Sequence, residues 1–540
     1  MAGPRGVALA HRLPAPEAEP ARQSAVRPGE WRWPALVAGI LLALTLGPIL
    51  LGWLMTPPGT TFTGYVVVGV DGPVYVADWR QGWAGAWLFH AMYTSEPLPP
   101  VLLYAWYVWA GHLVGGLAGP WLYHLTRLAS GVALLLAIYG LSAELFRPRR
   151  LRRLAFGLAV LGGGVGPFLG SSAQLGPLPL RATEMLVSGT SAGDLLSLAP
   201  HLSWAAALLC FLFTAALRYG KAPSGRMLVA TLAAQLGLEL IYPQLALLAV
   251  VVLVGLAVLH RGWRLLMLAG AAAAILAPYV GYLGLVELRS PMAMRQVRLT
   301  FELGDPFGFL VLSHLAASAL ILVAFARRRL PRALWLPALW IGAMTLCMFT
   351  PGISGVMGRT FIASSVPFGL MAGAALTVLR RRIQRRAVRR RLVALSLAGS
   401  SLFGLYSLAH PYAIAAGRLD AAAEYEPTGE ARLLAWVAPR TSRQTVILTT
   451  YLDGLFVPAQ TNARVYVGHP DQTIDAGQKA SLALAFFDAW SAEQRDVFLR
   501  ANHIAYVLAP DAARVDRLRD DPMLRLVRES EGSGLFEVQP

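Results

Sequence analysis

Charged residues are scarce in this chain. Of its 540 residues, 14% are charged and 56% are hydrophobic, whereas soluble domains carry about 25% charged residues. The apolar residues come in long blocks rather than in amphipathic periods. This scarcity excludes an ordinary multidomain soluble protein and indicates a membrane protein with long hydrophobic segments.

Cysteine is almost absent, and no cleavable leader is expected. The two cysteines, Cys210 and Cys347, lie inside apolar blocks, which excludes a disulfide framework and a thiolate metal site. Residues 1–30 are rich in Pro, Ala and Arg without an apolar core, so we expect a disordered cytoplasmic tail. The first apolar run, 33–55, is too long for a signal-peptide core and lacks a small-residue cleavage site.

Eleven apolar blocks are predicted as transmembrane helices, since about 20 apolar residues cross the bilayer core. They cover residues 33–55, 121–146, 154–170, 201–218, 227–241, 243–260, 264–285, 306–326, 333–350, 360–379 and 392–410. With the N-terminus inside, the arginine-rich loops 147–153 and 380–391 fall on the cytoplasmic side, as the positive-inside rule requires. We therefore predict a multispan α-helical membrane domain over residues 31–410, in the plasma membrane. The net charge of +17 then reflects these loops, and no nucleic-acid partner is expected.

The first outer loop, 56–120, contains two further apolar segments. Residues 101–119 are long enough to cross the membrane, but counting them as a span would invert every later loop. Both this segment and 74–89 are rich in Trp and Tyr, the residues that concentrate at membrane interfaces. We predict that both are interfacial helices.

The C-terminal part, 411–540, has more charge and shorter apolar runs. Strands are predicted at 446–450, 464–468, 505–509 and 534–539, with helices at 430–437, 476–490 and 491–503. Ser491 and Gln494 have the spacing of a capping box. The alternation predicts a small α/β domain. The count of eleven spans from a cytoplasmic N-terminus places this domain outside the cytoplasm.

Asp71 is the most informative polar residue of the first outer loop. It precedes Gly72-Pro73, which predicts a turn rather than a helix interior. A carboxylate there lies at the membrane boundary, where a polar acceptor and a lipid head group can meet. Taken alone, the residue is more typical of an ordinary solvated turn or helix cap than of a functional site.

The early Asp71, the two interfacial segments and the acidic-Pro element Ser95-Glu96-Pro97 together resemble the GT-C superfamily. Its protein O-mannosyltransferase and aminoarabinose transferase groups use polyprenyl-phosphate or polyprenyl-diphosphate donors. The resemblance implies that Asp71 binds the acceptor or acts as the base. It places Glu96 at the acidic-Pro position, although the usual basic residue before Pro-Pro is absent.

The same resemblance implies three further roles. Arg359, which opens a predicted span from the outer side, would hold the donor phosphate. A second carboxylate is expected on a nearby outer loop, and either Glu184 or Asp194 could supply it. Because some members of the superfamily use a divalent metal, one is compatible with the resemblance, but no ligand set in the sequence demands it.

Three other residues are candidates for substrate binding. Arg127 lies inside a predicted span, where a charge is costly, so we expect a buried partner such as Asp71 or Glu96. His201 opens a span and is either a phosphate or metal ligand or a simple interfacial histidine. His469 follows a predicted strand, where ligands often bind in α/β sheets, although a polar turn explains it as well.

The resemblance therefore implies a membrane glycosyltransferase. It would move a sugar from a polyprenyl-phosphate-linked donor to an acceptor glycan, lipid or protein on the extracytoplasmic side, by a single inverting displacement. The alternatives are a transporter or flippase, which tends to show inverted repeats and ionisable residues near the midplane, and a membrane protein that binds envelope polysaccharide.

Overall fold

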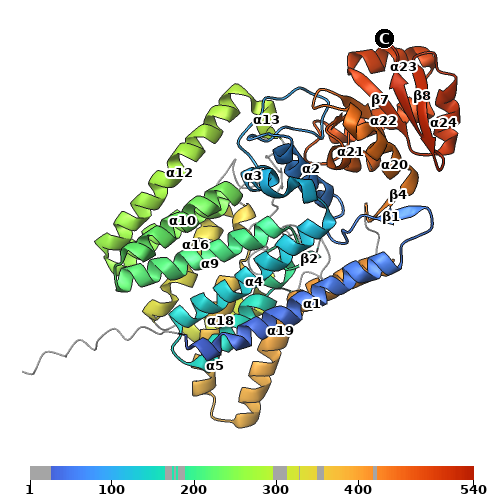
Figure 1. The fold of residues 1–540 in the computed structure, drawn as a ribbon. Coiled ribbons are helices and arrows are strands. Elements are labelled where there is room, and N and C mark those ends of the chain that lie inside the picture. The colour runs from blue at the N-terminus through green and yellow to red at the C-terminus, as the bar shows by residue number, and fades with distance from the viewer. Residues whose placement is uncertain are drawn as a thin grey trace, which may run out of the picture.

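The computed structural model in Figure 1 describes residues 26–540 apart from 165–172, 176–177, 181–188, 296–312, 327–328, 349–357 and 418–422. It consists of a helix bundle and a C-terminal α/β domain at one end of it. Two short helices, α2 and α3, lie between the two (Figure 1).

The bundle is built from helices that coincide with the predicted spans. They are α1 (Arg32–Leu54), α4 (Pro120–Leu145), α5 (Arg149–Leu161), α9 (Pro200–Lys221), α10 (Gly225–Ile241), α11 (Pro243–His260), α12 (Trp263–Arg289), α15 (Leu315–Phe325), α16 (Trp335–Met348), α18 (Ser365–Arg382) and α19 (Arg386–Ala415). Each predicted span overlaps one of these helices. Within the described residues, six helices are long and apolar enough to cross a membrane, namely α1, α4, α9, α11, α12 and α19. The prediction of a multispan helical membrane protein is confirmed.

Glycines let the bundle helices approach closely. A Cβ at Gly369 of α18 would overlap the backbone of Ala159 in α5, and one at Gly404 of α19 would overlap the carbonyl of Leu161. Gly163, in the glycine run that follows α5, packs against Phe403. Small residues at such contacts stabilise membrane helices by close packing.

Both predicted interfacial segments contain a short helix, α2 (Asp71–Trp83) and α3 (Ala105–Val114). Their backbones touch, because a Cβ at Gly82 would overlap the carbonyl of Val108. Apolar side chains remain exposed around them, with Trp83 at 62% and Leu113 at 85% of their full exposure. This aromatic and apolar exposure is typical of a membrane interface.

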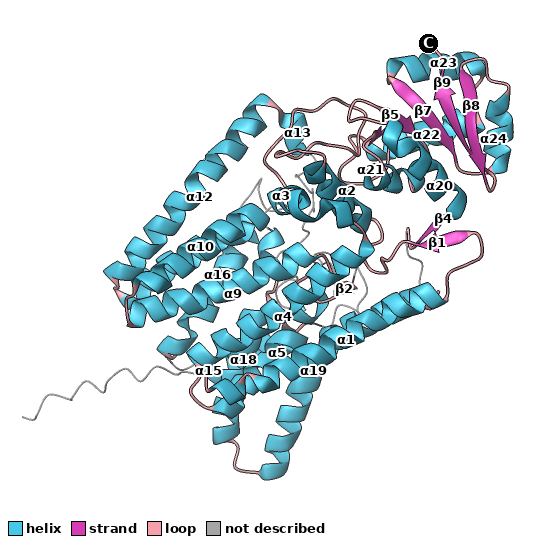
Figure 2. Ribbon diagram, viewed as in Figure 1, coloured by secondary structure: helices cyan, strands magenta, loops and turns pink. Residues whose placement is uncertain are grey.

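The C-terminal domain has a five-stranded sheet of order β6-β5-β7-β9-β8 (Figure 2). Its strands are β5 (Val446–Leu448), β6 (Arg464–Val465), β7 (Ile504–Ala509), β8 (Leu524–Ser530) and β9 (Ser533–Val538). Its helices are α20 (Thr428–Val437), α21 (Phe456–Gln460), α22 (Ala476–Asp488), α23 (Ala492–Ala501) and α24 (Ala512–Arg519). Strands β6, β5 and β7 are parallel, and β9 is antiparallel to β7 and β8. All four predicted strands are present, as is the capping box of Ser491 and Gln494, whereas β8 was missed.

The C-terminal domain is joined to the loop 56–120 by backbone and core contacts. Strand β1 (Thr60–Phe62) pairs with β4 (Tyr425–Pro427), and the N–H of Val465 in β6 donates to the carbonyl of Met92 at 2.9 Å. Met92 and its neighbours share one hydrophobic core with α20, α21 and β6. Helix α19 continues through Pro411 to Ala415, past the residue where we expected the domain to begin.

Candidate functional site

Asp71 and His469 are in direct contact although 398 residues separate them. Oδ1 of Asp71 lies 3.0 Å from Nε2 of His469. The Asp71 side chain is half exposed at 52%, whereas the His469 side chain is only 4% exposed. The contact joins the start of α2 to the loop after β6, so two residues singled out in the sequence belong to one site.

The sequence predicted a turn at Asp71, and this was wrong. Asp71 is the first residue of α2, within its first turn. A carboxylate at this place is stabilised by the positive end of the helix dipole. The backbone of Asp71 belongs to α2, and its side chain contacts His469.

A second carboxylate, Asp471, lies beside this pair. Burial raises the pKa of Asp471 above its ordinary value; the nearby His469 opposes the rise, and the charge of Asp71 adds to it. The charge of Arg359 also opposes the rise. Two carboxyls, an imidazole and a guanidinium are thus close enough to influence one another.

Arg359 lies in a short 3-10 helix, η4 (Gly358–Phe361). Its guanidinium forms a side-chain hydrogen bond with Tyr242, the residue between α10 and α11. Its charge also acts on His201 and Tyr104. The sequence placed Arg359 and His201 near the outer ends of spans, and the structure brings both to the same site as Asp71.

Aromatic rings line this site. Tyr75 is four residues after Asp71 and therefore on the same face of α2. Its ring stacks on Tyr107 of α3 with centroids 4.7 Å apart. The hydroxyl of Tyr107 is 2.9 Å from Nδ1 of His201, whose ring stacks on Tyr242. These rings form a wall beside the polar groups.

Tyr104 has a strained backbone at the edge of the site. It adopts left-handed angles, φ 49° and ψ 29°, immediately before α3, a conformation that is costly for a residue with a Cβ and is often found at functional sites. Burial raises the pKa of Tyr104 to about 12, while the charge of Arg359 opposes the rise. Its hydroxyl is therefore a neutral hydrogen-bond donor near Arg359.

Sequence reasoning missed the tyrosines of this site. The available signal was spacing, because Asp71 and Tyr75 are four residues apart. Such pairs share one face of a helix. Tyr242 lies between the predicted spans 227–241 and 243–260 and carries no such signal.

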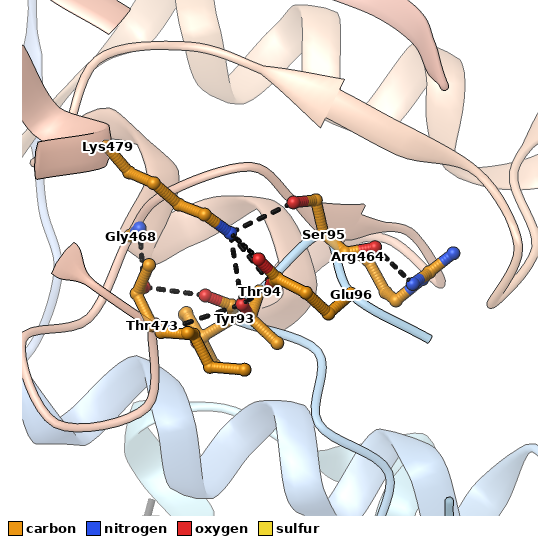
Figure 3. A network of polar contacts seen from close by, with 9 residues as sticks. Tyr93, Thr94, Ser95, Glu96, Arg464, Gly468, Thr473 and Lys479 are labelled. Carbon is orange, nitrogen blue, oxygen red and sulfur yellow. Dashed lines mark hydrogen bonds and ion pairs between the residues drawn. The ribbon is translucent and has the colours of Figure 1, made fainter. Parts of the chain in front are cut away.

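Glu96 is bound by the C-terminal domain (Figure 3). Nζ of Lys479 in α22 lies 2.7 Å from Oε1 of Glu96, and it also donates to Ser95 Oγ at 2.9 Å. Thr94 donates a further bond to Glu96. Burial would raise the pKa of Glu96, but the bonds from Lys479 and Thr94 outweigh it and hold the pKa below its ordinary value. Glu96 is therefore ionised and forms an ion pair with Lys479.

Of the two carboxylates predicted on the second outer loop, Asp194 and Glu184, the structure describes Asp194. Asp194 lies in α8 (Ala192–Leu195) and accepts a hydrogen bond from the N–H of Gly189 at 2.8 Å. Burial raises the pKa of Asp194 to about 6. This contact closes the 189–194 loop. Glu184 lies outside the described residues.

The prediction that Arg127 pairs with Asp71 or Glu96 was wrong. Arg127 is 1% exposed, but its guanidinium donates to Thr45 Oγ1 at 2.8 Å, to His124 Nδ1 at 3.2 Å and to the carbonyl of Leu196. Glu96 and Asp71 have their partners in the C-terminal domain. Neutral oxygen and nitrogen acceptors from α1, α4 and the segment before α9 satisfy this buried charge, because a guanidinium offers five donors to several acceptors at once.

Across the described ranges, no three His, Cys, Asp or Glu side chains converge on a common metal position. The positive charge available at the site comes from Arg359. Any anionic group that entered would meet this guanidinium beside the tyrosine wall.

Comparison with known proteins identifies the fold. No family model and no curated protein matches the sequence. Among solved structures, the chain is similar to ArnT from Cupriavidus metallidurans in the apo state, with a TM-score of 0.50 over 94% of this chain and 97% of that one. The chain has the ArnT fold. At 16% sequence identity this likeness is one of architecture, and it confirms the multispan helical fold with a C-terminal α/β domain expected from the sequence.

Proposed function

We propose that this protein is a membrane glycosyltransferase that takes a sugar from a polyprenyl-phosphate-linked donor. The observation that carries the proposal is the contact of Asp71 with His469 at a tyrosine-lined site, close enough to Arg359 for its charge to act on the neighbouring Asp471. A half-exposed carboxylate can accept a proton from an acceptor hydroxyl. A guanidinium matches the charge and geometry of a phosphate. The ArnT fold supports the same reading.

The reaction would be a single displacement. Asp71 takes the proton of the acceptor hydroxyl, and the acceptor oxygen forms a bond to the anomeric carbon. The bond from that carbon to the phosphate oxygen breaks, and the electron pair leaves with the polyprenyl phosphate. Arg359 and the Tyr104 hydroxyl stabilise the charge on the departing phosphate. The anomeric configuration inverts.

The site would face the extracytoplasmic side. The arginine-rich start of α5 and the loop between α18 and α19 lie at the end of the bundle away from the C-terminal domain (Figure 1). The positive-inside rule assigns that end to the cytoplasm. The acceptor would then be a glycan, lipid or protein of the cell envelope, and the donor would reach Arg359 from the outer leaflet.

Purified protein in lipid nanodiscs tests the proposal against a panel of radiolabelled polyprenyl monophosphate and diphosphate sugars. The expected result is release of label from one lipid donor in the presence of a hydroxyl acceptor or water, with Asp71→Asn as the inactive control. If no donor on the panel is consumed, the enzymatic reading is wrong. Movement of an intact labelled donor across proteoliposomes, without cleavage, would favour a flippase.

A further inference from the structure

We infer that the C-terminal domain completes the active site by supplying His469 as the residue that positions and orients Asp71. This inference rests on the proposed function of the site. The sequence indicated a substrate-binding histidine, but the geometry assigns His469 a different partner. Its Nε2 lies 3.0 Å from Asp71 Oδ1, and its side chain is only 4% exposed. It therefore offers little surface for contact with a substrate.

The hydrogen bonds around the ring fix its tautomer. The backbone N–H groups of Asp471 and Gln472 both donate to Nδ1 of His469, at 3.2 and 3.3 Å. Nδ1 must therefore present its lone pair, and in the neutral ring the proton is on Nε2. That proton points at Asp71. His469 donates one directed hydrogen bond to the carboxylate, which leaves the other oxygen, Oδ2, for the acceptor hydroxyl.

The segment that carries His469 is held on both sides. Thr473 Oγ1 accepts the N–H groups of Gly468 and His469, each at 3.2 Å, and donates to the carbonyl of Tyr93 at 2.6 Å. Gly468 is required here, because a Cβ would come within 2.6 Å of the carbonyl oxygen of Gly454.

The loop 90–96 provides the opposite wall. The N–H of Ile474 bonds to Thr94, and Lys479 bonds to Thr94, Ser95 and Glu96 (Figure 3). These contacts run from the loop through Thr473 to His469. The position of the imidazole is thus set by an interlock between the C-terminal domain and the loop before α3.

Kinetics of two substitutions at His469 test this assignment. His469→Ala removes the donor to Asp71, and we expect kcat to fall about 100-fold with the KM for the lipid donor unchanged, since a small displacement of a catalytic group has effects of this size. His469→Gln offers an amide N–H near the position of Nε2, and we expect it to recover kcat to within about 10-fold of the wild type.

A second pair of variants leaves His469 unchanged and alters Thr473, whose hydroxyl holds the segment that carries His469. Thr473→Val removes the hydroxyl that holds the segment, whereas Thr473→Ser retains it. We expect Thr473→Val to lower kcat and Thr473→Ser to behave as the wild type. Hydrogen exchange of the membrane helices should be the same in all four variants, which shows that the fold is intact.

Three results would overturn the inference. They are a wild-type kcat for His469→Ala, a raised donor KM at constant kcat, and a His469→Gln variant as slow as His469→Ala. The second would make His469 a substrate contact, and the third would make it a proton carrier. A wild-type protein that consumes no donor would instead overturn the proposed function.

Discussion

Lys479 Nζ lies 2.7 Å from Glu96 Oε1, and this ion pair joins the C-terminal domain to the loop that precedes α3. The Lys479 side chain is 9% exposed and that of Glu96 is 33% exposed. A pair this sheltered from water is screened less than a surface pair. It connects two parts of the chain that are distant in sequence and that both contribute to the site.

Lys479→Met should loosen this connection. The substitution keeps the length and apolar stem of the side chain but removes the cation from Glu96, which keeps the hydrogen bond from Thr94. We expect faster hydrogen exchange in residues 93–96 and 468–474, together with a lower kcat. Ser481→Ala, an exposed change on the same helix, is the matched control. Unchanged exchange in both segments would show that the pair does not hold the interlock.

Arg359→Gln should weaken binding of the lipid donor. The substitution removes a positive charge and the bond to Tyr242. A charge-assisted hydrogen bond contributes about 1.5–3 kcal/mol, so we expect kcat/KM for the donor to fall about 10- to 100-fold. The exposed Arg289 at the end of α12 provides the control Arg289→Gln. Equal kcat/KM in both variants would remove Arg359 from the donor site.

Glu430 makes the stability of the C-terminal domain depend on pH. Burial raises the pKa of Glu430 to about 9 from an ordinary value of 4.5, and the nearby carboxyls of Asp453 and Glu426 add to the rise. The folded domain keeps the proton that the unfolded chain releases above pH 4.5. The contribution of Glu430 to stability is therefore fully present below pH 4.5 and declines by about 1.4 kcal/mol per pH unit as pH rises toward 9.

Glu430→Gln should remove most of this decline. We expect the variant to be more stable than the wild type at pH 8 and nearly equal to it at pH 5. Hydrogen exchange of α20 at the two pH values measures the difference. Glu493→Gln, an exposed change on α23, should leave the wild-type dependence intact. If the Glu430→Gln variant kept the same pH dependence as the wild type, the titrating group would be another residue.

Cysteine labelling tests the sidedness of the site. Cys210 and Cys347 can be replaced by Ser, and single cysteines introduced as Ser481→Cys in the C-terminal domain and Arg385→Cys between α18 and α19. Both positions are exposed. An impermeant maleimide should label Ser481→Cys on intact cells and Arg385→Cys only after permeabilisation. The reverse pattern would place the site in the cytoplasm.

Much of the fold was predictable because hydrophobic length alone identifies membrane helices. All eleven predicted spans overlap helices, and the aromatic density of 101–119 correctly marked a short helix. Strand β8 was missed because its sequence, LRLVRES, is largely polar and lies at a sheet edge. Edge strands carry charged residues that hide their periodicity.

The site was predictable only in part. Asp71 stood out through its place in the loop, and Arg359 through the resemblance, but the contact between Asp71 and His469 spans 398 residues, and local patterns carry no such information. The buried charge of Arg127 led us to expect a carboxylate partner. The structure satisfies it with neutral acceptors, a solution that depends on three-dimensional packing and leaves no mark in the sequence.

Single-turnover consumption of a labelled polyprenyl-phosphate sugar tests the central claim most directly. With enzyme in excess in nanodiscs, the measurement reports the chemical step and not product release. The account predicts that the wild type transfers the label in one turnover, and that Asp71→Asn binds the donor with similar affinity but leaves the label on the lipid. Transfer by Asp71→Asn at the wild-type rate would contradict it.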